Sequence, residues 1–433
     1  MEIMNYSKVS IYYNNLLNNK IIKNIFIITA AWFLIRLVIY VITDFSNTYG
    51  GDSGYYISVG KNIVNDGIHG IFSSSLESIV PTSYRPPLYS LFVGLFMSIS
   101  ESSFFIFASQ SVISLLLSIS CYMILREENN VLALLAAILI ALSPSDALYN
   151  GRILSENIVT PLLVLSSMFF VFSKSIKGYL FSGVVVGATV LTRDVYILLP
   201  FIFIFFGFIS KIPTKYLLIY LLGFAIIVTP WVMRNVNLDN NGGAYVSKGI
   251  MWSNIWSGTW IRDHNDVISK DNIPKKALST FDPSLSDEEF LAIWKDRGNY
   301  EVFFKDTTIN YILNNPLQVL DAWVSRYHLL WMGTRSDLFN FNWERYSVGW
   351  YTIKLILYLI NTIIVLTSII GFYFAIKSKN KILLLFTPVI YSALIYVPFY
   401  NIETRYTQPI YPILMIFVSF FIVTIRNKYF NKA

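Results

Sequence analysis

Ile25-Phe-Ile-Ile-Thr-Ala-Ala-Trp-Phe-Leu-Ile-Arg-Leu-Val-Ile-Tyr-Val-Ile42 is the first of a series of apolar runs that decide the fold of this chain. Several such runs approach or exceed the ~20 residues that cross a bilayer as a helix. They lack the alternation of apolar and polar residues that marks the strands of a transmembrane barrel. We therefore expect an all-α, polytopic integral membrane protein.

The composition agrees with this fold class, since 55% of the 433 residues are hydrophobic and only 14% are charged. An ordinary soluble domain is roughly a quarter charged. The net charge of +7 does not indicate nucleic-acid binding, because the basic residues form no single patch and many lie in short loops. Cys121 is the only cysteine, which excludes an internal disulfide and a thiolate metal site. The first run lacks a small-residue cleavage site, so we expect a retained helix.

Basic loops set the predicted topology. Lys8, Lys20 and Lys23 place the N-terminus in the cytoplasm by the positive-inside rule. If residues 87–100 lie at the interface, nearly every short lysine-bearing loop falls inside, whereas a full span there would move four lysines of residues 174–215 outside. We therefore predict about ten membrane helices, each close to the length that spans a bilayer. They cover residues 25–42, 104–125, 131–148, 158–172, 179–191, 195–209, 216–233, 352–376, 382–399 and 410–425.

Polar stretches divide the chain into three predicted parts. Residues 1–233 form a transmembrane catalytic module that includes a first outer loop, residues 44–103. Residues 234–350 form an extracytoplasmic helical cap, and residues 351–433 form the C-terminal membrane helices. Apolar spacing predicts an amphipathic interfacial helix around residues 55–64 of the first outer loop. In the cap, Asn315-Pro316 is expected to separate two amphipathic helices.

Asp52 is the polar residue around which we organise the functional interpretation. It lies in Tyr49-Gly-Gly-Asp-Ser-Gly-Tyr-Tyr56, and Tyr84-Arg-Pro-Pro-Leu-Tyr89 follows in the same outer loop. An acid at the membrane surface of so apolar a chain is a functional-site candidate. The structural alternative is a solvated turn, for which glycine and aspartate are ordinary residues.

Further polar residues reach the same outer face on this topology. Each has a structural alternative: Arg152 and Glu156 have the spacing of a helical ion pair, and arginines at helix ends can reach lipid headgroups. Trp252, Trp256 and Trp260 could stack on a sugar or form an interfacial aromatic belt. A carboxylate can serve as a general base, and arginines can bind phosphate and stabilise its developing charge. The residues that converge are Arg85, Arg152, Glu156, Arg193, Asp194, Arg234, Arg405 and Tyr406.

The ordered motifs resemble those of the GT-C membrane glycosyltransferases, in particular the dolichyl-phosphate-mannose protein mannosyltransferase and aminoarabinose transferase-like group. Asp52 with the tyrosine pair after it is similar to the acidic motif of the first loop. The motifs that follow in order are Arg85-Pro-Pro-Leu-Tyr89, Leu142-Ser-Pro144, Arg152, Leu154-Ser-Glu156, Leu191-Thr-Arg193, Pro230-Trp-Val-Met-Arg-Asn235 and Arg405-Tyr406.

The resemblance implies transfer of a sugar from a polyprenyl-phosphate carrier to a hydroxyl acceptor on a glycolipid, polysaccharide or protein. This transfer would occur at the extracytoplasmic face of the inner or plasma membrane. Asp52 would be the general base and Glu156 a second acid near a substrate. The implied donor phosphate site comprises Arg85, Arg234, Arg405 and Tyr406, and further substrate contacts are expected from Tyr55, Tyr56, Tyr89, Arg193 and Trp256.

Two points limit what the resemblance implies. The aminoarabinose branch has an acid immediately before the basic-Pro-Pro segment, and Tyr84 occupies that position here. We therefore expect no obligatory metal cofactor. The competing functional class is a transporter or flippase of an anionic lipid-linked sugar, which would carry ionisable or helix-breaking residues near the membrane midplane. The visible charges concentrate at helix ends, which favours an enzyme over both a transporter and a non-catalytic scaffold.

Overall fold

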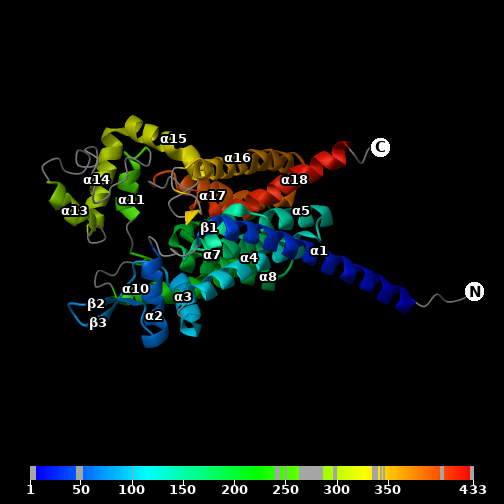
Figure 1. Ribbon diagram of the computed structural model, residues 1–433, viewed down its shortest axis with the longest axis horizontal. Coiled ribbons are helices and arrows are strands. Elements are labelled where there is room, and N and C mark those ends of the chain that lie inside the picture. The colour runs from blue at the N-terminus through cyan, green and yellow to red at the C-terminus, as the bar shows by residue number, and fades with distance from the viewer. Residues whose placement is uncertain are drawn as a thin grey trace, which may run out of the picture.

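The computed structural model is predominantly helical (Figure 1). It describes residues 6–44, 52–100, 102–238, 244–248, 251–262, 286–295, 300–333, 340–341, 344, 347–399 and 404–429. Most long helices run side by side in one bundle, and the cap lies beyond one end of it. The start of α1 (Tyr6–Ile42) and the end of α18 (Tyr411–Tyr429) lie at the opposite end, as expected if both face the cytoplasm.

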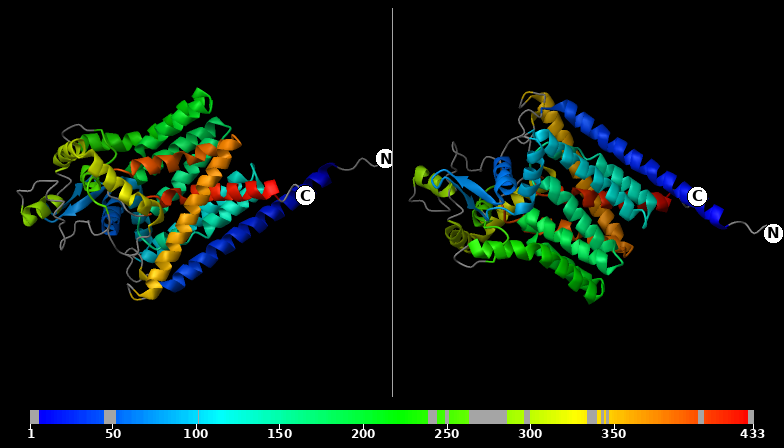
Figure 2. Two further views of the ribbon diagram at one scale, coloured as in Figure 1. Left: turned by 90° about the horizontal axis from the view of Figure 1, so that it is seen from above. Right: turned by 90° about the horizontal axis from the view of Figure 1, so that it is seen from below.

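Within the part of the chain that the structure describes, five helices are long and apolar enough to cross a membrane. They are residues 19–42 of α1, α4 (Ser103–Leu125), α10 (Thr214–Leu238), α16 (Val348–Lys377), and residues 408–429, which combine η5 (Gln408–Ile410) with α18. The last span is central, with 67% of its apolar window buried, whereas only 11% of the α1 window is buried. Figure 2 shows α1 in dark blue along the outside of the bundle.

Shorter apolar helices occupy four further predicted spans, residues 158–172, 179–191, 195–209 and 382–399. They are α7 (Glu156–Phe172), α8 (Ile176–Thr192), η1 (Asp194–Leu198) with α9 (Leu199–Ile209), and η4 (Lys381–Phe386) with α17 (Thr387–Ile395). The segment 87–100 is also a short apolar helix, α3 (Pro87–Ile99). The predicted helix positions agree closely with the structure, and their total of about ten membrane crossings stays a prediction.

Proline divides helices that the sequence analysis had expected to be continuous. The predicted helix over 131–148 is two helices, α5 (Asn130–Ala141) and α6 (Pro144–Asn150), which meet at an angle of 48°. Proline suits the first turn of a helix but clashes with a preceding turn. Pro200 and Pro388 likewise occupy the first turns of α9 and α17, each after a short 3-10 segment.

The first outer loop contains α2 (Ser53–Asp66), which confirms the predicted amphipathic helix, and packs it against α3. Between them lies a hairpin of β2 (Gly70–Ser73) and β3 (Ser78–Pro81). A second small sheet pairs β1 (Thr43–Asp44) with β4 (Asn340–Phe341). The all-α prediction omitted these two short sheets.

The cap has its own aromatic core. Its described helices are α11 (Met251–Gly258), α13 (Asp287–Lys295), α14 (Glu301–Asn314) and α15 (Pro316–Met332). The predicted break at Asn315-Pro316 is confirmed. The core consists of Trp256, Trp260, Ile261, Phe290 and Phe304.

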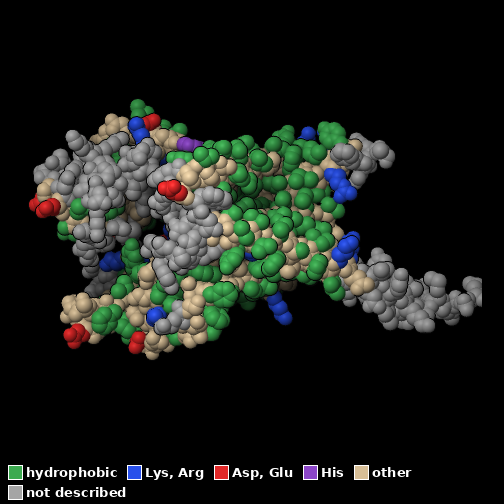
Figure 3. Space-filling view, viewed as in Figure 1, with side chains coloured by type: hydrophobic (Ala, Val, Ile, Leu, Met, Phe, Trp, Pro, Cys, Tyr) green, Lys and Arg blue, Asp and Glu red, His purple; other side chains and the backbone are tan. Residues whose placement is uncertain are grey.

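The surface seen in Figure 3 agrees with a membrane protein. Hydrophobic side chains cover the middle of the bundle, while acidic side chains appear at the cap end and basic ones at both ends. Exposed apolar residues of the outer helices, such as Phe33, Leu222 and Ile363, belong to this cover. Because lipid is the solvent that favours such a surface, the chain is a membrane protein.

Close packing of α2 on α3 generates a stability prediction. A Cβ added at Gly94 would lie 2.2 Å from the backbone oxygen of Gly60, whereas one added at Gly54 meets nothing within 4 Å. We expect Gly94→Ala to destabilise the protein by about 1–3 kcal/mol, the usual effect of overpacking. Thermal unfolding in detergent should show a lower midpoint for Gly94→Ala than for the control Gly54→Ala. Equal midpoints would contradict the close contact.

Candidate active site

Five charged side chains from distant segments meet in one network beside the first outer loop. Asp52 directly precedes α2, Arg85 precedes α3, and Glu156 is the first residue of α7. Arg193 follows the end of α8, and Arg405 lies in the turn before η5. Both acids stand at helix N-termini and Arg193 at a helix C-terminus, where the helix dipoles favour their charges.

Both oxygens of Asp52 are paired with arginines. Arg85 Nη2 donates to Oδ1 at 2.7 Å, and Arg405 Nη2 donates to Oδ2 at 2.8 Å. The side chain is still 25% exposed, so it can be approached from outside. Burial raises the pKa of Asp52, but the charges of Arg85 and Arg405 outweigh this effect and lower it to about 2. Asp52 is therefore ionised at physiological pH.

Glu156 is fully buried and is held by two further guanidinium contacts. Its Oε1 accepts a hydrogen bond of 2.6 Å from Arg193 Nη1 and another of 2.6 Å from Arg405 Nε. Arg405 therefore joins the two acids through different nitrogens. A buried carboxylate is tolerated when it is paired and hydrogen-bonded in this way.

Tyrosine rings surround the arginines. The guanidinium carbon of Arg85 lies 5.7, 5.5 and 5.3 Å from the ring centres of Tyr55, Tyr56 and Tyr84. The hydroxyl of Tyr56 also accepts a bond of 3.4 Å from Arg85 Nη1. Distances of this size give favourable cation–π contacts. The tyrosines therefore fix Arg85 beside Asp52 without neutralising its charge.

Tyr406 and Tyr89 have different surroundings. The ring of Tyr406 lies 4.9 Å from the guanidinium carbon of Arg193 and 5.7 Å from that of Arg405, so it borders the network. Tyr89 is buried, and its hydroxyl donates to Gln110 Oε1 at 2.7 Å. Gln110 in turn donates to the backbone oxygens of Asn150 and Arg152. Tyr89 therefore supports the turn that leads to Glu156.

Like Tyr89, the predicted site residues Arg234 and Trp256 lie outside the network. Arg234 donates to the backbone oxygens of Thr82 and His69, at 2.8 and 2.9 Å, and thereby ties α10 to the base of the outer hairpin. Trp256 is fully buried in the cap core, so neither face of its ring is open to a sugar. In this conformation the contacts of Arg234 and Trp256 are with the protein itself and not with the charged network.

A largely buried ion pair within the bundle was not predicted from the sequence. Arg36 Nη2 in α1 lies 2.6 Å from Asp146 Oδ2 in α6, and it also donates to Ser114 and Asn150. An arginine inside the first apolar run was a sufficient signal, because a charge in a membrane helix requires a polar partner. The bend between α5 and α6 brings Asp146 to this position.

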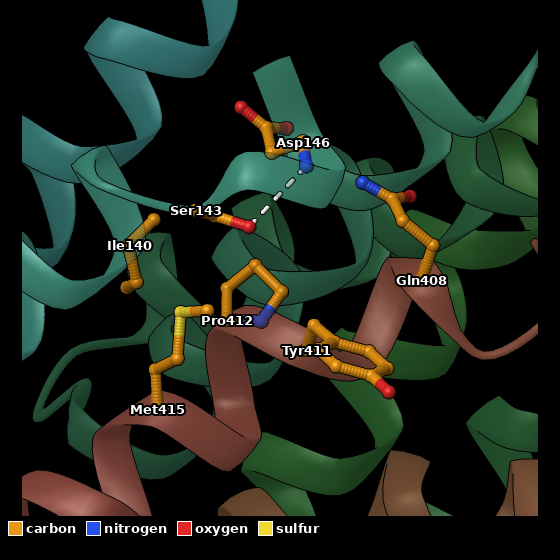
Figure 4. A pocket seen from close by; sticks show the side chains of 7 residues that line it. All are labelled: Ile140, Ser143, Asp146, Gln408, Tyr411, Pro412 and Met415. Atoms are coloured by element: carbon orange, nitrogen blue, oxygen red, sulfur yellow. Dashed lines mark hydrogen bonds between the residues drawn. The ribbon is translucent and has the colours of Figure 1, made fainter. Parts of the chain in front are cut away.

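A small pocket lies beside Asp146, between the α5–α6 bend and the start of α18 (Figure 4). Ser143, Asp146 and Gln408 supply its polar side, and Ile140, Tyr411, Pro412 and Met415 complete its lining. Gln408 Oε1 lies 2.9 Å from the Thr160 hydroxyl, whose oxygen is also 2.6 Å from the backbone oxygen of Glu156. The pocket thus adjoins the framework of the charged network but not its carboxylates.

The described residues contain no group of three or more histidine, cysteine, aspartate or glutamate side chains placed to hold a metal ion. The two site carboxylates instead accept from arginines, which are the partners that also suit a phosphate group. The arrangement can therefore bind an anion through guanidinium groups and present one partly exposed carboxylate to a neutral hydroxyl.

Comparison with known proteins gives one family match. Residues 84–233 match the model of the dolichyl-phosphate-mannose-protein mannosyltransferase family. The matched segment includes Arg85, Glu156 and Arg193, and it leaves Asp52 and Arg405 outside. A search of the curated proteins found no match. The resemblance that the motifs predicted is confirmed over this segment.

Glu156 generates a prediction about stability. Glu156→Gln removes the charge that two buried arginines share, and loss of one partner of a buried ion pair typically costs about 3–5 kcal/mol. We expect a clearly lower unfolding midpoint in detergent. Glu128→Gln is the matched control, because Glu128 pairs with Lys381 at the surface and such pairs contribute at most about 1 kcal/mol. Similar midpoints for both variants would contradict the buried network.

Proposed function

We propose that this chain, whose residues 84–233 match the dolichyl-phosphate-mannose-protein mannosyltransferase family, is a glycosyltransferase of the GT-C type that transfers a sugar from a polyprenyl-phosphate carrier to a hydroxyl acceptor at the extracytoplasmic membrane face. The family implies a lipid-linked donor and an acceptor in the membrane. The observation that carries the proposal is the bridging of Asp52 and Glu156 by Arg405. It supports the proposal because guanidinium groups, which suit a phosphate, lie directly beside a partly exposed carboxylate.

In the proposed reaction, Asp52 takes the proton of the acceptor hydroxyl as its oxygen attacks the anomeric carbon. The bond between that carbon and the phosphate oxygen breaks, and its electron pair stays on the phosphate. Arg405 and Arg85 stabilise the charge that develops there. Attack from the side opposite the phosphate gives inversion at the anomeric carbon.

The pairing of Asp52 also determines its strength as a base. In the unliganded site two arginines hold its pKa at about 2, which favours the ionised form but makes it a weak base. A donor phosphate attracts the same guanidinium groups and adds a negative charge nearby. Both effects raise the pKa of Asp52, so the carboxylate becomes a stronger base once the donor is bound.

Glu156 has a different part in this proposal. Its side chain is fully buried, so it does not touch the acceptor directly. It instead orients Arg405 and Arg193 by accepting one hydrogen bond from each. Glu156 is therefore a positioning residue, and Asp52 is the proposed catalytic residue.

The transporter alternative draws support from the buried Arg36–Asp146 pair, since ionisable groups within the bundle are typical of transport pathways. However, Arg36 also donates to Ser114, Asn150 and the backbone of Ala141, which is the bonding expected of a structural ion pair. The enzyme proposal accounts for the outer network as well, and we prefer it for that reason.

Loss of the base is the first functional prediction. Asp52→Asn keeps the size of the side chain but cannot accept the proton, so turnover should fall by ~10²–10⁴. Because the pKa of Asp52 without donor lies far below neutrality, kcat/KM of the wild type should not fall through Asp52 protonation between about pH 5 and 8. Transfer rates would be measured across this range with folding checked by gel filtration. Near-normal turnover of the variant would exclude Asp52 as the base.

The donor class is the second functional prediction. Purified protein would be offered polyprenyl-phosphate sugars and nucleotide sugars in parallel, with a membrane extract as the acceptor source. We expect transfer only from the lipid-linked donors, and we expect Arg405→Ala to weaken use of the donor more than use of the acceptor, since a charged hydrogen bond contributes about 1.5–3 kcal/mol. Transfer from nucleotide sugars alone would overturn the proposed donor.

A further inference from the structure

Arg326 of α15 is a buried arginine whose side chain bonds to backbone oxygens from three segments. Its exposed fraction is only 2%. Nη1 donates to Gly258, Ile261 and Ala322 at 2.7, 2.8 and 3.0 Å, and Nη2 donates to Val397 and Phe399 at 3.0 Å each. Arg326 therefore joins the end of α11 in the cap to the segment that follows α17 in the membrane bundle.

The bonded oxygens explain why an arginine is suited to this position. Most belong to backbone that follows a helix end, where carbonyl groups lack partners within the helix. The planar guanidinium offers several donors in fixed directions, which a lysine does not. The two joined segments also touch directly, because a Cβ at Gly258 would lie 1.9 Å from the oxygen of Pro398.

The C-terminal half of α15 also contacts the stretch of chain that contains Arg405. Tyr327 donates through its hydroxyl to Ala393, and the backbone oxygen of Gly333 accepts from the amide of Thr404 at 3.3 Å. Thr407 and Tyr411 donate to the backbone oxygens of α15 residues. Arg405 lies within this supported stretch, between Thr404 and Thr407. Its position thus depends on contacts from the last cap helix.

We propose that Arg326 is a positioning residue through which the cap sets Arg405 against Asp52 and Glu156. The functional consequence rests on the proposed role of Arg405 at the donor phosphate. The printed bonds of Arg326 go to backbone oxygens and not to Arg405 or to either carboxylate. It therefore acts by fixing α15, whose backbone oxygens hold Thr407 and Tyr411 beside Arg405. The cap and the charged network are thereby held in a fixed position relative to each other.

The test compares Arg326→Lys with Arg262→Lys, a control that alters a cap arginine paired with Asp321 at the surface. Hydrogen exchange measured by mass spectrometry reports the backbone of residues 404–411 without requiring a substrate. We expect faster exchange there in Arg326→Lys and no change in the control. Tyr327→Phe removes a single hydrogen bond and should give a smaller effect in the same direction. It replaces Arg326→Lys as the test variant if Arg326→Lys does not fold.

Binding of farnesyl phosphate, a short polyprenyl phosphate, supplies the functional readout. Arg326→Lys should weaken binding about tenfold, which corresponds to the net loss of one or two hydrogen bonds. Its effect should largely disappear in the Arg405→Lys background, because both changes act on the same contact. A general folding defect would instead lower binding equally in both backgrounds.

The outcomes separate this inference from the proposed function. Unchanged exchange over residues 404–411 in both Arg326→Lys and Tyr327→Phe would overturn the positioning role, as would additive effects of Arg326→Lys and Arg405→Lys on binding. Faster exchange in a protein whose wild type binds neither farnesyl phosphate nor a farnesyl phosphodiester would support the positioning of Arg405 and contradict the lipid-phosphate donor.

Discussion

The guanidinium of Arg405 lies between two carboxylates that enter the site from different parts of the fold. Nη2 bonds to Asp52 on the first outer loop, and Nε bonds to Glu156 at the start of a buried helix. A buried charge without a partner is very unfavourable, so these groups constrain one another's positions. The first outer loop, α7 and the turn before α18 must therefore meet in one arrangement. The packing of the other helices holds these three segments in that arrangement.

Much of this arrangement follows from simple features of the sequence. Apolar runs predicted the helix positions, and ordered polar motifs predicted that Asp52, Glu156 and Arg405 would lie on one face. The details that were missed depend on contacts between distant residues. Whether Arg234 reaches a phosphate or the backbone of an outer hairpin is decided by tertiary packing, and so is the burial of Trp256. Periodicity carries no information about either.

Proline accounts for the main local differences between expectation and structure. An apolar run looks continuous when only hydrophobicity is considered, yet Pro144, Pro200 and Pro388 each begin a new helix. Such breaks shorten several spans and free backbone groups that other parts of the chain must satisfy. The break before Pro144 has a clear structural use, because it turns Asp146 toward Arg36. Proline alone does not decide such a break, because Pro161 and Pro230 lie inside the continuous helices α7 and α10.

The charge balance of the network has a consequence for the order of events in a catalytic cycle. Three guanidinium groups and two carboxylates leave one uncompensated positive charge. A sugar linked to a lipid by a phosphodiester carries one negative charge, so its arrival would make the site neutral. In the proposed reaction the phosphate monoester left after transfer can carry a second negative charge, since its second pKa is about 6, and this charge is balanced while Asp52 holds the acceptor proton. Once Asp52 releases that proton the site is left with a net negative charge, which assists departure of the spent carrier into the lipid.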